Sequence, residues 1–141
     1  MIKFRGIAIG DRNAEAGEIV YGDYCRGLSK ENPSIRCWSK RCYVDVAEES
    51  VSQYLTKCAN GELYDGDEIR IDMEKAAQIV GEGLMLSTIK NTKPTAEAKL
   101  YVEYSHYRYR LIWRTPNGRV DTGLDLALIS NILECVEVVR I

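Results

Sequence analysis

VSQYLTKCANGELYDGDEIRI, residues 51–71, is the stretch that decides the fold class of this chain. Its first seven residues read as a strand, and the Asn60-Gly61 dipeptide that follows is typical of a tight hairpin turn. Gly66-Asp67 marks a second turn, because glycine tolerates positive φ and aspartate accepts hydrogen bonds from its own backbone. The stretch therefore predicts short antiparallel strands joined by tight turns.

The same turn signals occur earlier in the chain. GEIVYGD at 17–23 has the spacing of GELYDGD at 61–67: Gly-Glu, an apolar residue, two residues more, and then Gly-Asp. Each copy reads as a turn, a short strand and a second turn. The repeat is informative about the arrangement of strands and turns, but it contains no motif typical of a catalytic or binding site.

Strand patterns continue on both sides of this stretch. The segments that read as strands are 2–9, 18–24, 35–46, 51–57, 63–64, 68–72, 98–114, 119–122 and 136–141. The segment 98–114 is rich in tyrosine and is long enough for a bend or for two strands. Thr115-Pro116-Asn117-Gly118 follows it as a hairpin turn.

Two segments break the strand pattern. Apolar residues at helical spacing predict a helix within 73–89. The residues expected on its buried face are Met73, Ala76, Ala77, Val80 and Leu84. Gly81 and Gly83 each weaken a helix by roughly 1 kcal/mol relative to alanine, so this helix is expected to end near Gly83. Asp125 is expected to cap a short, nearly buried helix over 126–133.

These elements predict a mainly β fold of the β-rich α+β kind. Closely spaced turns favour a small barrel or a bent antiparallel meander with one or two short helices. The length of 141 residues fits a single domain over 1–141. The alternative is two small β-rich halves divided near 72–97, where Pro94 lies in a polar loop.

Three parts of the chain resemble the YopX family of phage and prophage proteins. Members of that family typically carry QYTG, a few residues, and NGKEIYEGDIVRI. Here QY at 53–54 and NGELYDGDEIRI at 60–71 follow in the same order at nearly the same spacing. IKFRG at 2–6 is similar to the family's IKFR start, and CVEVVRI at 135–141 is similar to its closing CEVIGNI, without the Asn-Pro that usually follows. The resemblance implies a β-rich, phage-encoded protein of unassigned activity and supplies no catalytic residues.

The composition is that of an ordinary globular protein. The chain is 45% hydrophobic and 28% charged, which argues against disorder and fibrous repeats. Its apolar runs are far shorter than the ~20 residues that a membrane-spanning helix needs, and no secretory signal is visible. We therefore expect a protein of the bacterial host cytoplasm that does not engage a membrane.

The cysteines and the single histidine give little support for a metal site. The five cysteines are Cys25, Cys37, Cys42, Cys58 and Cys135, an odd number without a Cys-x-x-Cys pair, and they read as reduced thiols. Cys37 and Cys42 have a spacing that zinc can use, but a second ligand pair is missing. We expect no metal and no cofactor.

The segment YVEYSHYRYRLIWR at 101–114 carries the sharpest surface signal. If it is one strand, alternate residues share a face. That face would hold Tyr104, His106, Arg108, Arg110 and Arg114. Arginines next to aromatic rings are typical of single-stranded nucleic-acid binding, in which guanidinium groups meet phosphates and rings stack on bases. A net charge of −2 excludes a globally basic binder but not such a local face.

Two other interpretations of this strand remain open. In one, the strand is half-buried and its arginines pair with some of the 21 acidic residues. In the other, the basic face binds an acidic protein partner.

A second, weaker basic patch is formed by Arg36, Trp38, Lys40 and Arg41. Trp38 offers a ring on which a base can stack. The competing interpretation is a strand with a core tryptophan, because large aromatic side chains mostly serve packing.

No catalytic grouping stands out in the sequence. His106 lies among arginines, which oppose its protonation, and no cysteine lies in a recognisable nucleophile setting. Asp65 and Asp67 can share a face, but two carboxylates do not make a cation site. We expect a non-enzymatic phage or prophage accessory protein that acts as a binding module. The alternatives are single-stranded nucleic-acid binding through the strand above and a self-associating structural module, a homo-oligomer paired through strand edges.

Overall fold

The computed structural model describes residues 2–26 and 32–139 of the chain, and over these residues the fold is mainly β, as predicted. Contacts between residues divide the chain into two compact parts, Met1–Tyr54 and Leu55–Ile141. We call them unit 1 and unit 2. Residues 72–97, which the sequence offered as a dividing segment, form helices inside unit 2.

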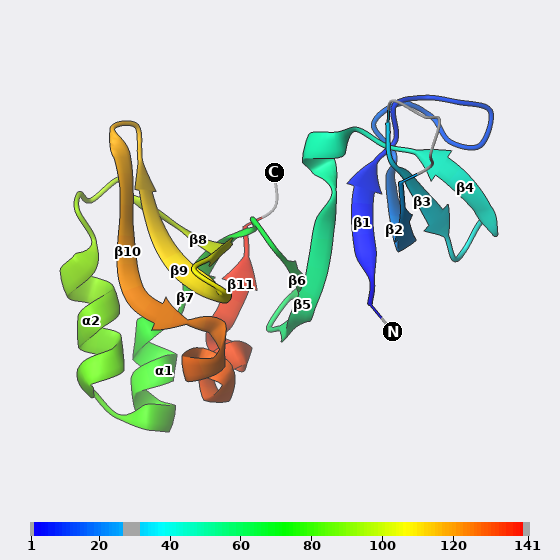
Figure 1. Ribbon diagram of the computed structural model, residues 1–141. Coiled ribbons are helices and arrows are strands. Elements are labelled where there is room, and N and C mark those ends of the chain that lie inside the picture. The colour runs from blue at the N-terminus through cyan, green and yellow to red at the C-terminus, as the bar shows by residue number, and fades with distance from the viewer. Residues whose placement is uncertain (1, 27–31, 140–141) are drawn as a thin grey trace. The chain divides into compact units, whose positions relative to one another are not determined.

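Unit 1 is an antiparallel meander. Its strands are β1 (Phe4–Ile7), β2 (Ile19–Cys25), β3 (Ser34–Cys37), β4 (Cys42–Asp45) and the first residues of β5 (Ser52–Cys58), preceded by the short 3-10 helix η1 (Glu48–Ser50). They lie in the order β4-β3-β2-β1-β5 (Figure 1). The sheet bends, because Ala8 just after β1 forms an isolated bridge with Val46 just after β4. A bent meander, and not a closed barrel, is therefore what the described strands form.

A small core fills the inner face of this sheet. Its buried members are Ala8, Ala14, Val20, Ile35, Cys37, Val44 and Val46, with Phe4, Cys42 and Val51 packed against them. Alternate residues of each strand contribute to the core, as expected when successive side chains point to opposite faces. The other residues of the same strands face away from this core.

The first copy of the repeated motif does not form two turns. Gly22-Asp23, predicted to be a bend, lies in the middle of β2, with Gly22 opposite Cys37 and Asp23 opposite Arg36. Gly66-Asp67 does form the predicted turn, with Gly66 at φ +88° and the Asp67 carboxylate accepting a hydrogen bond from the Tyr64 amide at 2.8 Å. The two segments therefore have the same residue types for different reasons. Gly22 lets β2 and β3 lie close together, whereas Gly66 adopts the positive φ of a turn.

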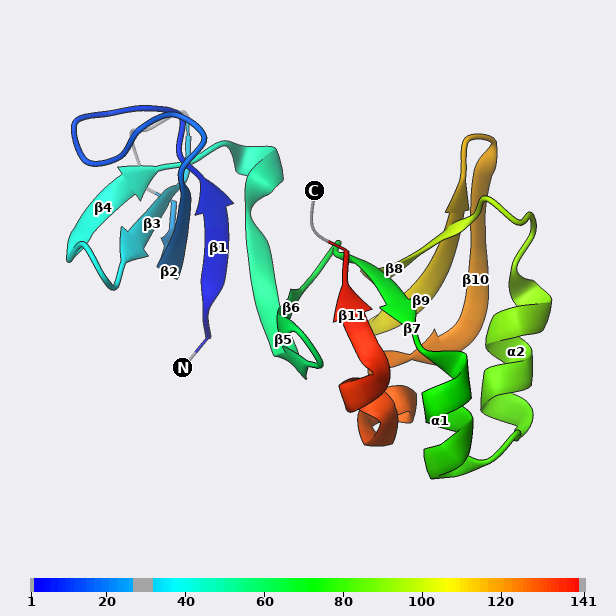
Figure 2. The ribbon, with the colours of Figure 1, turned by 180° about the vertical axis from the view of Figure 1, so that it is seen from behind.

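Unit 2 is built on a second antiparallel sheet. The end of β5 pairs with β6 (Gly61–Tyr64), and the main sheet contains β7 (Glu68–Ile71), β8 (Lys99–Ser105), β9 (Arg108–Thr115), β10 (Gly118–Asp125) and β11 (Val136–Val138). The order is β10-β9-β8-β7-β11 (Figure 2). The final strand, predicted over 136–141, ends at Val138, and residues 140–141 lie outside the described part of the chain.

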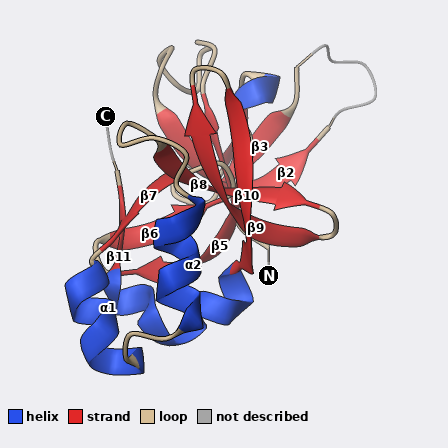
Figure 3. Cartoon of the chain, turned by 90° about the vertical axis from the view of Figure 1, so that its left-hand side faces the viewer, coloured by secondary structure: helices blue, strands red, loops and turns tan. Residues whose placement is uncertain are grey.

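Three helical segments accompany this sheet, where one or two were predicted. They are α1 (Met73–Val80), α2 (Leu84–Thr92) and the 3-10 segment η2 (Leu126–Cys135). Figure 3 shows α1 and α2 side by side. The single helix expected within 73–89 is thus two helices, and Leu84, expected on the buried face, is 85% exposed at the start of α2. The predicted Asp125 cap is confirmed by a hydrogen bond from the Leu128 amide to its carboxylate at 3.0 Å.

The helices cover one face of the main sheet and bury its larger core. The sheet contributes Ile69, Leu100, Val102, Leu111, Trp113, Val136 and Val138, and the helices contribute Ala76, Leu86, Ile89, Ile129 and Ile132. Trp113 is tied to α2, because its indole Nε1 donates to the Ile89 carbonyl at 3.1 Å and contacts the Thr92 hydroxyl at 3.2 Å. This link fixes one wall of the pocket described next.

Candidate functional site

One cavity of unit 2 opens where β7 and β8 separate. The two strands pair at Glu68 with Tyr101 and at Ile69 with Leu100. Beyond Ile69 the pairing between β7 and β8 stops. The space between the diverging strands and α2 is a pocket of about 470 Å³. This volume lies within the range of small-molecule sites, roughly 300–1,000 Å³.

The inside of the pocket is apolar. Its lining includes Ile69, Ile71, Met73, Ile89, Ala98, Leu100 and Trp113. Ile69 and Ile89 are each 2% exposed, so the cavity ends on the core of unit 2 and not on mobile surface groups. An apolar ligand group that enters gains about 25 cal/mol for each Å² of apolar surface removed from water.

The rim of the pocket is basic. Its charged lining residues are Glu68, Arg70, Lys90, Lys93 and Lys99, which is four cations and one carboxylate. The Lys99 ammonium lies 4.0 Å from the Glu68 carboxylate, and this pair offsets part of the charge. The surplus is positive, so the rim favours a ligand with a negative group.

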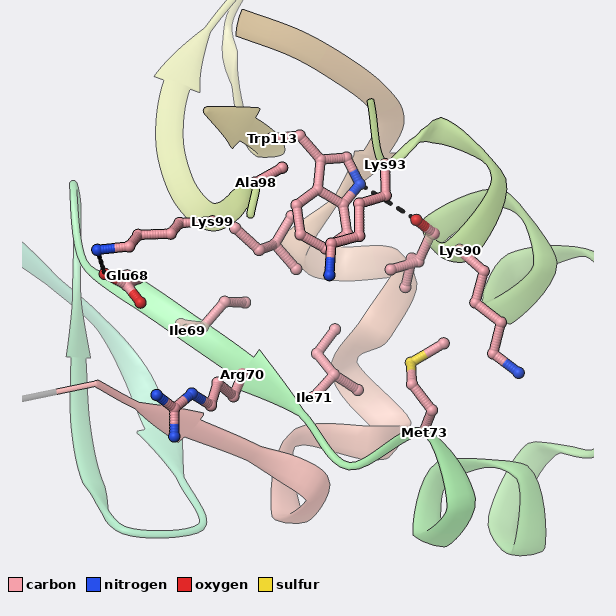
Figure 4. A pocket seen from close by; sticks show the side chains of 12 residues that line it. Glu68, Ile69, Arg70, Ile71, Met73, Lys90, Lys93, Ala98, Lys99 and Trp113 are labelled. Carbon is pink, nitrogen blue, oxygen red and sulfur yellow. Dashed lines mark hydrogen bonds and ion pairs between the residues drawn. The ribbon is translucent and has the colours of Figure 1, made fainter. Parts of the chain in front are cut away.

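Lys93 is the cation best placed to meet a ligand in this pocket. Its Nζ lies 5.3 Å from the centre of the Trp113 ring, a cation–π arrangement. Figure 4 shows the Lys93 chain beside that ring, whereas Arg70 and Lys90 extend away from it. A negative group above Trp113 would therefore meet Lys93 first.

Sequence reasoning did not find this pocket. Its residues come from β7, the start of α1, the end of α2, the loop that follows it, β8 and β9, and each short segment reads only as an ordinary strand, helix or loop. The one visible signal is the run of lysines at 90, 93 and 99 around Pro94, a segment that the sequence presented only as a polar loop.

The predicted basic strand at 101–114 is a hairpin. Ser105 ends β8 and Arg108 begins β9, with His106 and Tyr107 in the turn at φ 51° and 66°. Tyr104 pairs with Tyr109 across the hairpin, with ring centres 5.1 Å apart. The prediction that all five residues share one face is therefore wrong for Tyr104 and His106, because Tyr104 pairs with Tyr109 on the face opposite Arg108 and Arg110, and His106 lies in the turn.

The arginines of this hairpin contact acidic side chains. Arg108 lies 3.2 Å from Asp125, and Arg110 lies 3.4 Å from Asp121. Arg114 forms an ion pair with Glu103, and Arg119 donates a hydrogen bond to the same carboxylate, which is only 7% exposed as a residue. This is the arrangement of the half-buried interpretation, in which acids across the sheet offset the positive charge.

Residues of the second patch lie at the β3–β4 hairpin. Arg36 is on β3, and the Lys40 ammonium is 3.0 Å from Glu18, which lowers the pKa of Glu18 through their hydrogen bond. Trp38 is 40% exposed, and its indole Nε1 donates to Asp23 at 3.1 Å. The core-tryptophan interpretation is therefore wrong. Arg41 has φ 55° in the turn.

The paired aspartates of the Gly66 turn serve the backbone. The Asp67 carboxylate accepts from the Tyr64 amide, and the Asp65 carboxylate accepts from the Tyr104 amide at 3.3 Å. Burial raises the pKa of Asp65, and the nearby Asp67 charge adds to the rise. Among the residues that the structure describes, no three His, Cys, Asp or Glu side chains gather as metal ligands would.

Comparison of the chain with family models, with curated proteins and with solved structures found no match. The similarity to the YopX family thus rests on the sequence segments at the start, middle and end of the chain. Over the described residues, none of the helices has the length and apolar character needed to span a bilayer.

Proposed function

We propose that this protein is a cytoplasmic binding module, a phage or prophage accessory protein of the YopX kind, whose unit 2 takes an apolar ligand that carries one negative group. The observation that supports the proposal most is the pocket between β7, β8 and α2, with an apolar interior and Lys93 at its mouth. The apolar part of the ligand would lie against Ile71, Met73 and Trp113.

The two parts of the ligand contribute unequally. Burial of the apolar part supplies most of the affinity, because Lys93 is exposed and an exposed ion pair contributes only about 0.2–1 kcal/mol. Lys93 therefore acts mainly in selection, favouring an anion over a neutral molecule of the same shape.

A matched pair of dyes tests this assignment. The first is 8-anilinonaphthalene-1-sulfonate, and the second is N-phenyl-1-naphthylamine, which has the same rings without the sulfonate. In a Trp38→Phe variant, Trp113 is the sole remaining tryptophan and reports from the pocket wall. We expect both dyes to quench Trp113 and to gain fluorescence.

Three variants separate the contributions. Lys93→Gln should weaken sulfonate binding about two- to fivefold and leave the neutral dye unchanged. Ala98→Leu fills the cavity and should weaken both dyes, whereas Lys57→Gln, at an exposed lysine outside the pocket, should change neither. If Ala98→Leu leaves the affinity for both dyes unchanged, or if neither dye quenches Trp113, the pocket is not the binding site.

A further inference from the structure

Unit 1 carries an aromatic surface that the pocket of unit 2 does not involve. On the face of its sheet opposite the core lie the rings of Tyr21, Trp38, Tyr43 and Tyr54 and the cations Lys3 and Arg36. We call these six residues the aromatic face. Val20, Ile35, Cys37 and Val44 are buried on the inner side, so alternation directs their strand neighbours Tyr21, Arg36 and Tyr43 away from the core. The other three join this face through contacts: Lys3 lies over the rings of Tyr21 and Tyr54, and the Trp38 indole donates to Asp23, two residues from Tyr21 on β2.

Lys3 joins two of the rings. Its Nζ lies 5.2 Å from the centre of the Tyr21 ring and 5.9 Å from that of Tyr54. The backbone supports this arrangement, because the Tyr54 amide donates to the Lys3 carbonyl at 2.8 Å and so places β5 beside the start of β1. A cation thus lies among aromatic rings on neighbouring strands.

Trp38 and Tyr43 extend the same surface across the sheet. The Trp38 amide donates to the Tyr21 carbonyl at 3.1 Å, and its indole Nε1 is held by Asp23, so the ring has a defined place while 40% of the residue stays exposed. Tyr43 is 52% exposed and lies opposite Arg36 in the β3–β4 ladder. Rings held this way lose little conformational freedom when a flat group stacks on them.

We propose that the aromatic face binds single-stranded nucleic acid, with bases stacked on Trp38 and Tyr43 and phosphates beside Lys3 and Arg36. Rings and cations alternate across neighbouring strands, which is the combination that base planes and phosphates require. The chemistry fits a nucleic acid better than an acidic peptide, because carboxylates would use the cations and leave the rings without a partner. Five strands spaced about 4.8 Å apart give a surface roughly 19 Å wide, enough for a short site of about four nucleotides.

This site differs from the hairpin at 101–114, the location that the sequence favoured for the same ligand. The arginines of that hairpin contact Asp121, Asp125 and Glu103, so their charges are offset within unit 2. On the aromatic face, Asp23 is the acid opposite Arg36, and it also accepts the Trp38 indole hydrogen bond.

The test is binding of a fluorescein-labelled oligodeoxythymidylate by the whole chain, followed by anisotropy and by tryptophan fluorescence. Trp38 should be quenched as bases stack on it, and the Trp38→Phe variant, which keeps the buried Trp113, should show no quenching. Affinity should fall with salt, with a slope of about −0.7 for each phosphate contact, or roughly −1.4 for Lys3 and Arg36 together.

Point variants locate the site. Tyr43→Ala should weaken binding about tenfold, and Tyr43→Phe should restore it, because stacking needs the ring and not the hydroxyl. Arg36→Ala should reduce the magnitude of the salt slope, the change in log affinity with log salt concentration, by about 0.7. Tyr107→Ala and Lys57→Ala, exposed residues of unit 2 with the same chemistry, should have no effect. Urea unfolding of each variant confirms that it is folded.

Two results would overturn the proposal. One is the absence of any anisotropy change at protein concentrations up to about 100 μM in low salt, the weak end of non-specific binding. The other is binding that Tyr107→Ala weakens while folded Tyr43→Ala and Arg36→Ala variants retain it, which would place the ligand on the hairpin of unit 2.

Discussion

Gly22 leaves no room for a side chain where β2 pairs with β3. A Cβ built on this residue would lie 1.9 Å from the Arg36 carbonyl oxygen, a backbone atom that cannot move without shifting β3. Gly22→Ala should therefore lower the free energy of unfolding by about 1–3 kcal/mol, the usual cost of overpacking. Urea unfolding measures this loss, and Cys25→Ala at the exposed end of the same strand is the control. An unchanged midpoint for Gly22→Ala would contradict the close approach.

Asp65 should make the protein less stable at neutral pH than an uncharged residue would. Burial raises the pKa of its carboxyl above the ordinary 3.8, so the folded state holds this proton more tightly than the unfolded state. The free energy of unfolding therefore falls as pH rises from about 3.8 through the folded pKa. Asp65→Asn removes the charge and keeps an oxygen for the Tyr104 amide.

We expect Asp65→Asn to be more stable than the wild type at pH 7 and to lose this advantage below pH 3.8, where the wild-type carboxyl is protonated in both states. Urea unfolding at the two pH values measures the difference. A variant that is less stable at pH 7, or whose advantage does not depend on pH, would show that the Asp65 charge carries no cost.

The β8–β9 hairpin contains backbone strain at its tip. His106 and Tyr107 both have positive φ, a region that costs residues with a side chain roughly 1–2 kcal/mol each and that favours Asn-Gly in two-residue hairpin turns. Tyr107 is 92% exposed, so its ring gains little from packing. The double change His106→Asn with Tyr107→Gly should raise the free energy of unfolding by about 1–2 kcal/mol.

The midpoint of urea unfolding measures this gain. A matched control is Tyr104→Phe, two residues before the turn, which leaves the backbone unchanged. Equal or lower stability of the double variant would mean that contacts of the two side chains, such as the 2.8 Å contact between His106 and Ser105, offset the strain.

At the same scale, strand pattern and turn chemistry predicted most elements but not their partners. The sequence indicated strand material over 98–114, and Gly66-Asp67 and Asp125 behave as their chemistry predicts. Residues 106–119 hold four arginines and no acidic residue, so this segment is strongly basic in the sequence alone; Glu103, Asp121 and Asp125 lie just outside it. Strand pairing brings these acids to the arginines, and a linear reading does not show strand pairing.

At the scale of the whole molecule, the pocket was the least predictable feature. Ile69, Lys93 and Trp113 are widely separated along the chain and meet only because β7 and β8 diverge next to α2. The aromatic face was partly predictable, since Trp38 and Arg36 were identified as a patch, but Lys3, Tyr21 and Tyr54 join it only through the meander. Local patterns set the elements, and the order of strands sets which side chains meet.

The two units have separate cores, which gives a test of cooperativity. Val44 is fully buried in the core of unit 1, and truncating it to alanine should cost about 2 kcal/mol through the cavity that remains. Each unit contains one of the two tryptophans, Trp38 in unit 1 and Trp113 in unit 2. Trp113→Phe and Trp38→Phe backgrounds therefore report on the units one at a time.

We expect Val44→Ala to lower the urea midpoint reported by Trp38 and to leave the midpoint reported by Trp113 nearly unchanged, because domains with their own cores unfold as separate cooperative units. The converse change, Val102→Ala in the core of unit 2, should shift only the Trp113 transition. If either substitution moves both transitions by the same amount, the chain unfolds as one domain over its full length, and the division at Tyr54 has no thermodynamic meaning.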